Sequence, residues 1–423
     1  MSLRMMHPAR RVVITGLGVV SSTGMGRSEF WKAVVEGRSG VRHITGFPCE
    51  DLYSRVAGEI TDFDPSAYMN SRDARRSGKF VHYSVAAARM ALEDSQIDLG
   101  SVDPFRAGVV FGNSSAGNGN VTDEIYERFL EKGMKGFGST DCVQLAAHAG
   151  TAHVFIEMGL RGPNATVGSG CCSGLEAIHQ GTEILRSGQA DVMVVGASEA
   201  CVSRFGLSLL CRVGVVSGHN EEPGKASRPY DATRDGLVLS EGAGAVVLET
   251  ARHAVKRGAP IYAEVRGYGT ATEAQHLVVP DPSGIELAHA FRQALQEARL
   301  ASADIDYVCA HGIANMDYDR ADTRALKMVL GDRAHHIPIS SIKSTTGQPF
   351  AAGGAWQAIA SCMSIREHLV PPTINYSVPD PDCDLDYVPN TARRARVDTV
   401  MLNSHSFGGT HAALILRRFE DTA

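Results

Sequence analysis

Short apolar runs recur along the chain, and each is rich in β-branched residues and bounded by glycine. This pattern is typical of buried strands in a parallel sheet. It predicts six strands, over residues 10–20, 106–115, 191–200, 243–250, 306–312 and 398–409.

Stretches of helical character separate these runs. Examples are SEFWKAVVEG, YSVAAARMALEDS and LAHAFRQALQEARLA. The alternation of strand and helix along the whole chain predicts a layered α/β architecture.

The two parts of the chain repeat one order of elements. In TVGSGCCSGLEAIHQGTEILRSGQADVMVVGAS, a glycine-rich turn precedes a helix and an aspartate-led apolar strand, and SSIKSTTGQPFAAGGAWQAIASCMSIREH with the later DTVMLNSHSFGG has the same order. We interpret this as an internal duplication with halves at 10–258 and 259–420, divided at the turn KRGAPIY. We expect such a fold to bring the glycine-rich turns 167–174 and 343–348 together across a pseudo-twofold axis and to build a site there.

Composition narrows the class of protein. Hydrophobic residues make up 43% and charged residues 21%, as in ordinary globular proteins, and the net charge of −6 gives no reason to expect nucleic acid or an anionic membrane as a partner. No apolar run reaches the roughly 20 residues of a membrane span. The basic N-terminal segment has no apolar stretch behind it, so we expect no secretory signal. The nine cysteines form no CxxC pairs, which argues against zinc and a disulfide framework and favours a cytoplasmic location.

Two adjacent cysteines lie in the glycine-rich run VGSGCCSG, at residues 167–174. On a helix that begins near 171, Cys171 starts the apolar stripe, and Cys172 is turned about 100° away. The positive end of a helix favours a thiolate and stabilises an oxyanion on an attached acyl group. Taken alone, however, a free cysteine more often packs as a small buried hydrophobe.

The segment S-G-C-C-S-G resembles the nucleophile turn T-A-C-A-T-G of the β-ketoacyl-[acyl carrier protein] synthases of the thiolase superfamily, with Cys171 on the nucleophile and Cys172 on the following alanine. The resemblance covers nearly the whole chain and is strongest to the bacterial, elongating type II form (synthase II-like). It implies an α/β, thiolase-like duplicated fold with five layers, α-β-α-β-α. The other matching segments are RRVVITGLGVVSSTG, RPYDATRDGLVLSEGAGAVVLE, PPTINYSVPDPDCDLDYVPNTAR and NSHSFGGTHA.

The resemblance also assigns site residues and shows where this chain departs from the family. His311 matches the histidine of H-G-T-x-T, whereas Gln348 replaces the histidine of K-S-x-x-G-H. Lys343 of that motif remains, Phe407 matches the acyl-pocket gate, and Asp322 and Glu241 match acidic positions that support the site. The two threonines that bind the pantetheine arm in the family are replaced by Ile313 and Asn315, and the gate loop has His405, Ser406 and His411 as further departures.

The implied reaction is acyl transfer to Cys171, followed by condensation with a malonyl group that loses CO₂. Two histidines donate to the malonyl thioester oxygen in the family, and a glutamine can also donate but cannot titrate. Three alternatives therefore stay open. The chain is a working ketosynthase of fatty acid or polyketide elongation, an acyltransferase or priming variant, or a partner subunit similar to the chain-length factors of aromatic polyketide systems, against which the retained Cys171 argues.

The resemblance implies an acyl carrier protein as partner, substrates carried on its phosphopantetheine, no metal and no further cofactor. Arg72, Arg75, Arg76 and Lys79 are basic candidates for docking an acidic carrier. A homodimer through the central sheets is expected, or a heterodimer with another ketosynthase.

Overall fold

The computed structural model describes residues 10–115 and 119–421. The first nine residues, on which the absence of a secretory signal was predicted, lie outside this range. The main sheet has the strand order β11-β10-β14-β15-β9-β1-β8-β7-β5-β6. Its strands are β1 (Val12–Ser21), β5 (Ala107–Gly112), β6 (Asn164–Val167), β7 (Val192–Glu199), β8 (Gly242–Thr250), β9 (Ala263–Thr272), β10 (Tyr307–Cys309), β11 (Ile339–Ser340), β14 (Thr399–His405) and β15 (Thr410–Arg417).

The sheet consists of two half-sheets with one pairing pattern. β1-β8-β7 and β9-β15-β14 are antiparallel series, and each is continued by two parallel strands, β5-β6 and β10-β11. The two half-sheets meet where residues 12–14 of β1 pair with residues 263–265 of β9. The repeated pattern agrees with a duplication, while the boundary at residue 258 stays a prediction.

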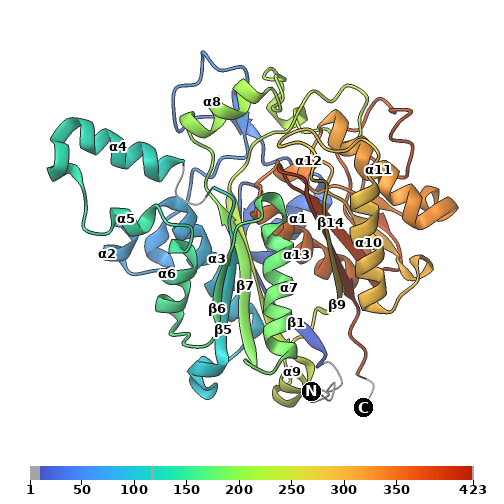
Figure 1. Cartoon of the computed structure of the whole chain (residues 1–423), viewed down its shortest axis with the longest axis horizontal. Coiled ribbons are helices and arrows are strands. Elements are labelled where there is room, and N and C mark those ends of the chain that lie inside the picture. The colour runs from blue at the N-terminus through green and yellow to red at the C-terminus, as the bar shows by residue number, and fades with distance from the viewer. Residues whose placement is uncertain (1–9, 116–118, 422–423) are drawn as a thin grey trace.

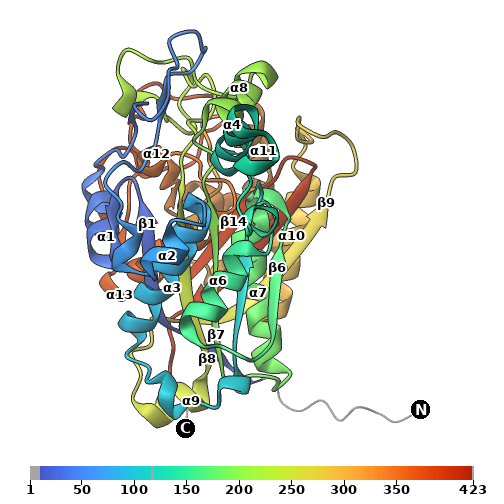
Figure 2. The same cartoon turned by 90° about the vertical axis from the view of Figure 1, so that its left-hand side faces the viewer.

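Helices form the other three layers (Figures 1 and 2). Between the half-sheets lie α7 (Ser173–Arg186) and α13 (Ala352–Glu367). α3 (Lys79–Ser95) and α6 (Ala149–Met158) cover the N-terminal half, and α10 (Ile285–Ala298) and α11 (Met316–Leu330) cover the C-terminal half. The remaining helices are α1 (Gly26–Glu36), α2 (Ser71–Ala74), α4 (Asn120–Lys132), α5 (Asp141–Gln144), α8 (Arg204–Val213), α9 (Ala251–Arg257) and α12 (Lys343–Thr346).

The two central helices approach each other at a pair of glycines. A Cβ on Gly174 would lie 2.6 Å from the Ala351 carbonyl oxygen, and a Cβ on Gly354 would lie 2.8 Å from the Leu175 amide nitrogen. Both are closer than side-chain carbons pack, so only glycine permits this crossing. Because α7 follows Cys171 and α13 follows Gln348, the crossing brings the two glycine-rich turns together, as predicted.

All six predicted strands exist, but not all are parallel. β8 runs antiparallel to β1 and β7, because the segment 200–241 leaves and re-enters the sheet at the same end. A strand buried on both faces has the same apolar character in either direction, so the sequence pattern could not distinguish them. β9 was not predicted, because Gly267 and Gly269 interrupt its apolar run. They allow the backbone of α10 to approach, and a Cβ at either position would lie 2.2 Å or less from a carbonyl oxygen of that helix.

Candidate active site

The candidate nucleophile lies in a tight turn between β6 and α7. Residues 170–172 form one 3₁₀ turn, and Gly170 has a φ of +63°. Ser173 fixes this turn, because its hydroxyl accepts from the Ser169 N–H at 2.9 Å and contacts the Gly170 carbonyl oxygen at 2.7 Å. The turn delivers Cys171 to the amino end of α7.

Both cysteines are buried, but in different surroundings. All positions of the predicted stripe are buried, but Cys171 lies in the turn before α7 and outside the central core cluster. Cys172 belongs to that cluster with Leu175 and Ile178, and its thiol lies 3.3 Å from the carbonyl oxygens of both Ser404 and Thr410. Cys172 is therefore enclosed between α7 and the β14–β15 pair. The residues of the buried stripe are Cys171, Leu175, Ile178, Thr182 and Leu185.

The Cys171 thiol is not stabilised as a thiolate in the resting protein. Burial raises its pKa to about 12, and Glu199 acts in the same direction, while Lys343 and the hydrogen bond from Gln348 only partly oppose them. Effects that favour the thiolate are thus present but are outweighed, because desolvation of the charged form is the larger effect. The sulfur has to lose its proton as it attacks.

Gln348 is brought directly to the nucleophile. Its amide Nε2 lies 3.4 Å from the Cys171 sulfur. Its backbone is held on both sides, since its N–H donates to the Val238 carbonyl oxygen at 2.7 Å and its own carbonyl accepts from the Ser240 N–H at 3.0 Å. The buried Oε1 has no hydrogen-bond partner in the described residues. The side chain therefore presents a donor and an acceptor to whatever occupies the site.

His311 follows β10 and is 1% exposed. Its N–H donates to the Asn403 side chain at 3.2 Å, its Nδ1 lies 3.5 Å from the Ser404 hydroxyl, and its Nε2 has no partner within residues 10–115 and 119–421. Burial, with the positive charge of Lys343, holds the pKa of His311 well below its usual value. The imidazole is therefore neutral at pH 7, and Nε2 is available to a ligand.

Lys343 supports the His311 backbone rather than the sulfur. Its Nζ donates to the His311 carbonyl oxygen at 2.7 Å and to the Gln357 side chain at 3.4 Å. Burial lowers its pKa to about 8.

Asp322 and Glu241 have different roles. Asp322 accepts from the Asn403 amide at 2.8 Å and from the Tyr230 hydroxyl at 2.7 Å, so it fixes the residue that holds His311. Glu241 lies instead beneath α3, where the Ile60 N–H at 3.1 Å and the Tyr83 hydroxyl at 3.2 Å donate to it. Within the described residues, the hydrogen bonds and ion pair of Glu241 join it to Ile60, Tyr83 and Lys79, and not to Cys171, His311 or Gln348. Its role belongs to the packing of the N-terminal half.

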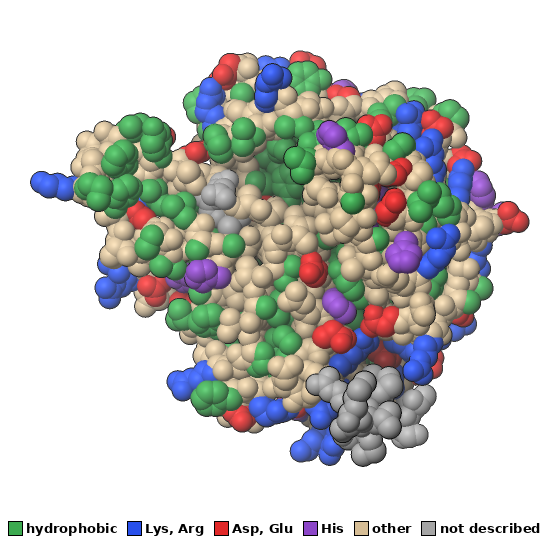
Figure 3. Space-filling view, in the orientation of Figure 1, with side chains coloured by type: hydrophobic (Ala, Val, Ile, Leu, Met, Phe, Trp, Pro, Cys, Tyr) green, Lys and Arg blue, Asp and Glu red, His purple; other side chains and the backbone are tan. Residues whose placement is uncertain are grey.

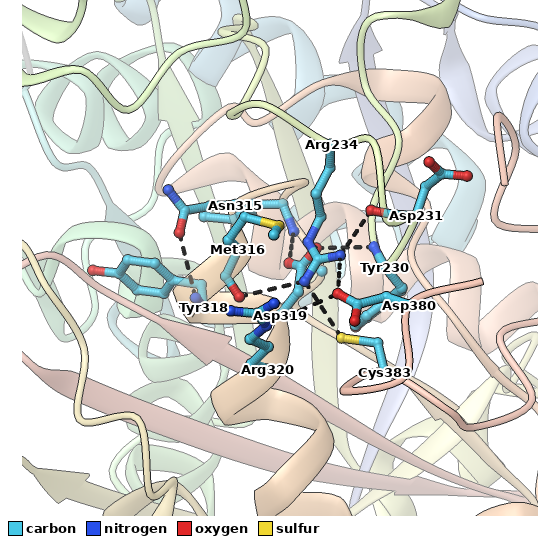
Figure 4. Close-up of polar contacts among 12 residues, drawn as sticks. Tyr230, Asp231, Arg234, Asn315, Met316, Tyr318, Asp319, Arg320, Asp380 and Cys383 are labelled. Atoms are coloured by element: carbon cyan, nitrogen blue, oxygen red, sulfur yellow. Dashed lines mark hydrogen bonds and ion pairs between the residues drawn. The ribbon is translucent and has the colours of Figure 1, made fainter. Parts of the chain in front are cut away.

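The two residues that replace the threonines of the family have structural roles in this protein. Ile313 is buried, and Asn315 caps α11 by accepting from the N–H groups of Asp317 and Tyr318 at 3.1 and 3.4 Å (Figure 4). The side-chain carbonyl oxygen of Asn315 therefore already accepts hydrogen bonds in the resting protein.

A buried ion-pair network holds the same loop (Figure 4). Asp319 accepts from the Ile313 N–H at 3.0 Å and the Tyr230 N–H at 2.9 Å. The Arg234 guanidinium lies between Asp319, at 3.2 Å, and Asp380, at 2.7 Å. The network ties the loop that carries His311 to two distant segments. The D-x-x-R-D-G segment matched the family, but its sequence did not reveal this pairing.

Phe407 lies beyond β14 and is half-buried. Its ring centroid is 5.9 Å from that of Tyr318 and 6.2 Å from that of Phe350. The Gly408 N–H donates to the Leu277 carbonyl oxygen at 2.7 Å. Phe407 thus belongs to an aromatic cluster beside the nucleophile. Tyr318 completes that cluster and was not predicted.

Ser406 makes a contact that no sequence pattern predicted. Its Oγ accepts from the Cys171 N–H at 3.2 Å, and a Cβ on Gly170 would lie only 2.0 Å from it. Ser404, two residues earlier, donates to the Cys171 carbonyl oxygen at 2.9 Å. Both peptide groups of the nucleophile are therefore held by serines of the gate segment.

Of the basic candidates for carrier docking, Arg72, Arg75 and Arg76 are exposed on and after α2. Lys79 is less exposed, and its Nζ lies 3.6 Å from the buried Glu241. It is therefore engaged within the molecule.

Two findings concern membrane-spanning helices and metal sites in the described part of the chain. No helix in it is long and apolar enough to cross a membrane. Within it, no three His, Cys, Asp or Glu side chains are grouped so that they could hold a metal ion.

The sequence profile described as "Beta-ketoacyl synthase, N-terminal domain" matches residues 9–254, and "Beta-ketoacyl synthase, C-terminal domain" matches residues 262–377. The chain belongs to the β-ketoacyl synthase family, which is a family of acyl-transferring enzymes. The predicted relationship to synthase II and the thiolase-like fold are confirmed.

Relatives and solved structures match over almost their full length. The chain is 38% identical to 3-oxoacyl-[acyl-carrier-protein] synthase 2 of Coxiella burnetii, with 97% of this chain and 99% of the relative covered. It is 41% identical to the tetracenomycin polyketide synthase ketoacyl synthase alpha subunit of Streptomyces glaucescens, with 98% and 99% covered. Two solved structures have a TM-score of 0.90, and both cover 97% of this chain and 100% of their own. They are a type II polyketide acyl-carrier protein in complex with its ketosynthase, at 32% identity, and the ishigamide ketosynthase/chain length factor, at 33%.

Proposed function

We propose that this protein condenses an acyl thioester with malonyl-[acyl carrier protein], with loss of CO₂, through an acyl-Cys171 intermediate. The observation that carries this proposal is the buried Cys171 thiol at the amino end of α7, with the Gln348 amide 3.4 Å from its sulfur. The pathway is fatty acid or polyketide chain elongation. The substrates are carried on the phosphopantetheine of the carrier, and the protein needs no cofactor of its own.

In the first step, the Cys171 sulfur attacks the carbonyl carbon of the acyl thioester. A carbon–sulfur bond forms to Cys171, the bond to the pantetheine sulfur breaks, and the Cys171 proton leaves with the pantetheine thiol. Backbone N–H groups at the amino end of α7 stabilise the negative charge that develops on the acyl oxygen.

In the second step, the malonyl carbon–carboxylate bond breaks and CO₂ leaves. The electron pair passes into an enolate, whose carbon attacks the acyl group on Cys171. The Cys171 sulfur leaves as a thiolate and takes up a proton. The Nε2 of His311 is placed to donate to the enolate oxygen, because it is buried, neutral and without another partner.

The test separates the two steps. Acyl-carrier is incubated with the protein, and peptide mass spectrometry locates the acyl group, which we expect on Cys171 and not on Cys172. Release of CO₂ from malonyl-carrier is measured in parallel. Cys171→Ser should abolish acylation, while Cys172→Ala, the matched control, should retain it. An acyl group on Cys172 alone would contradict the assignment of the nucleophile.

A second candidate function is an acyltransferase or priming enzyme, which would load Cys171 but release little CO₂. The favouring observation is that Gln348 contacts the sulfur where a titratable imidazole is expected. Acylation of Cys171 without CO₂ release from any malonyl-carrier would support this function over condensation.

The carrier partner is proposed to dock on Arg72, Arg75 and Arg76. These side chains are exposed, and their charge complements an acidic protein. If they steer docking, neutralising all three should lower kcat/KM for carrier-bound substrates and weaken its salt dependence, while turnover of a free pantetheine thioester stays unchanged.

A further inference from the structure

Three histidine side chains form a buried row behind the nucleophile. His405 ends β14 and His411 lies opposite it on β15. The His405 ring centroid is 5.0 Å from that of His311, nearly parallel at 20°, and 4.8 Å from that of His411, edge to face at 89°. Each of the three residues is at most 2% exposed.

The row begins at the reaction centre. Ser404 and Ser406, the two chain neighbours of His405, contact the carbonyl and the N–H of Cys171 respectively. The Tyr318 ring, 5.8 Å from that of His405, packs against the same imidazole. The His405 imidazole therefore stacks directly on that of His311, whose own Nε2 has no partner in the described residues.

His405 has no hydrogen-bond partner on either ring nitrogen in the described residues. The nearest charged atom is the Asp322 Oδ1, 3.8 Å from Nε2, and that oxygen already accepts from Asn403. A buried polar group without a hydrogen-bond partner destabilises the folded protein. An apolar ring could fill this position without that cost, so two free nitrogens here point to a missing ligand.

His411 holds this imidazole in place. Its Nε2 lies 2.9 Å from the Glu273 Oε1, and the Glu273 N–H donates to the Gly409 carbonyl oxygen at 2.9 Å. The edge contact of the fixed His411 ring restricts how the His405 ring can turn. His411 is a positioning residue.

We propose that His405 is a catalytic residue that supplies a second imidazole donor to the reaction centre, beside the His311 imidazole and the amide donor of Gln348. The inference rests on the proposed function. When the malonyl carboxylate leaves as CO₂, the electron pair moves onto the thioester oxygen. The N–H groups of His311 and His405 hydrogen-bond to that oxygen and keep their protons throughout.

The experiment compares CO₂ release from malonyl-carrier by the wild type, His405→Phe and the double variant His405→Phe/Gln348→His. His179→Phe is the matched control, because His179 also stacks on an aromatic ring, that of Tyr268 at 4.1 Å, outside the site. Acylation of Cys171 is measured separately by mass spectrometry, and thermal melting verifies the fold.

We expect His405→Phe to lower CO₂ release by about 10²-fold, the usual effect of losing one oxyanion donor. Acylation should change little, and the double variant should recover most of the loss. His179→Phe should behave as the wild type. Unchanged CO₂ release in His405→Phe, or no recovery in a folded double variant, would overturn the inference.

Binding of a malonyl-pantetheine amide, which holds the carboxylate and a carbonyl oxygen, separates this inference from the proposed function. If the wild type releases no CO₂ but binds the amide more tightly than His405→Phe does, the proposed reaction is wrong and the donor assignment stands. If both proteins bind it equally or not at all, the assignment of His405 is wrong.

Discussion

At Cys171 two electrostatic effects oppose each other. The helix terminus, Lys343 and Gln348 favour the thiolate, whereas burial favours the neutral thiol and prevails. The resting nucleophile is therefore held as the thiol, whereas the thiolate is the reactive form. It becomes reactive only when a bound substrate accepts its proton.

Substitution of Gln348 measures directly how much its side-chain amide contributes to CO₂ release. Gln348→Ala removes a donor beside the developing charge, so we expect CO₂ release to fall by up to roughly 10²-fold. Gln348→His should preserve or raise it. Acylation of Cys171 should change little in either variant. CO₂ release and acyl-enzyme formation are measured separately, and an unchanged rate in Gln348→Ala would mean that the amide only fills space.

The Ser406 hydroxyl accepts a hydrogen bond from the Cys171 N–H, a donor that the oxygen of the acyl group needs. Because its hydroxyl accepts from the Cys171 N–H in the resting protein, it must be displaced when the acyl group enters. A hydrogen bond contributes about 0.5–1.5 kcal/mol net, so Ser406→Ala should acylate roughly two- to tenfold faster in a stopped-flow assay. Ser406→Gly controls for backbone freedom and should match it. Slower acylation in both would show that the hydroxyl assists the step.

Among the elements, the loops around the site depend on a few buried carboxylates. Asp231 joins the segment 228–235 to the segment 376–379, since its carboxylate accepts from the N–H groups of Thr233, Ser377 and Val378 at 2.8, 2.6 and 2.6 Å. Two segments distant in sequence are thereby fastened at one side chain.

The Asp231 carboxylate makes the free energy of unfolding depend on pH. Burial would raise the pKa of Asp231, but its hydrogen bonds outweigh burial and lower the pKa to about 2. A carboxylate whose pKa is depressed on folding stabilises the protein above its unfolded pKa. We expect about 2 kcal/mol of unfolding free energy to be lost as the pH falls from about 4 to 2. Denaturant titrations across this range should show a shallower acid dependence for Asp231→Asn than for the wild type.

How far the sequence predicted the fold and the site can be seen from particular elements. The apolar runs located β1, β5, β7, β8, β10 and β14, and the repeated glycine-rich turns predicted that Cys171 and Gln348 meet. Strand direction could not be predicted, because buried strands of either direction share one pattern. β9 could not be predicted, because glycines interrupt its sequence. The contacts of Ser406, His405 and Arg234 depend on tertiary geometry that no local pattern encodes.

At the scale of the whole molecule, one surface is apolar enough to need a partner. α4 and α8 contact each other, α4 projects from the body, and hydrophobic side chains gather on that projection (Figures 1 and 3). The exposed apolar α4–α8 surface consists of Tyr126, Phe129, Leu130, Met134, Phe137, Phe205, Leu209 and Val213.

We expect this surface to bury itself against a second copy of the chain. Leu130→Asp/Leu209→Asp places two charges in the contact, so the solution mass should fall from twice 45.1 kDa to the single value in light scattering. Phe105→Asp is the control, since Phe105 is equally apolar and 64% exposed but lies outside this surface. A wild-type monomer that acquires a partner only on co-expression with another ketosynthase would support a heterodimer instead.

The crossing of α7 and α13 limits which amino-acid substitutions this protein can accept. Every amino-acid substitution of a glycine introduces a residue with a Cβ. At Gly174 such an atom would collide with the carbonyl of Ala351, and at Gly354 with the backbone of Leu175. Neither position therefore accepts another residue without a shift of the helices that set the spacing of Cys171 and Gln348. The reaction centre can therefore diversify through its loops, as it has at 348, 405 and 406, whereas a substitution at either glycine would disturb the crossing itself.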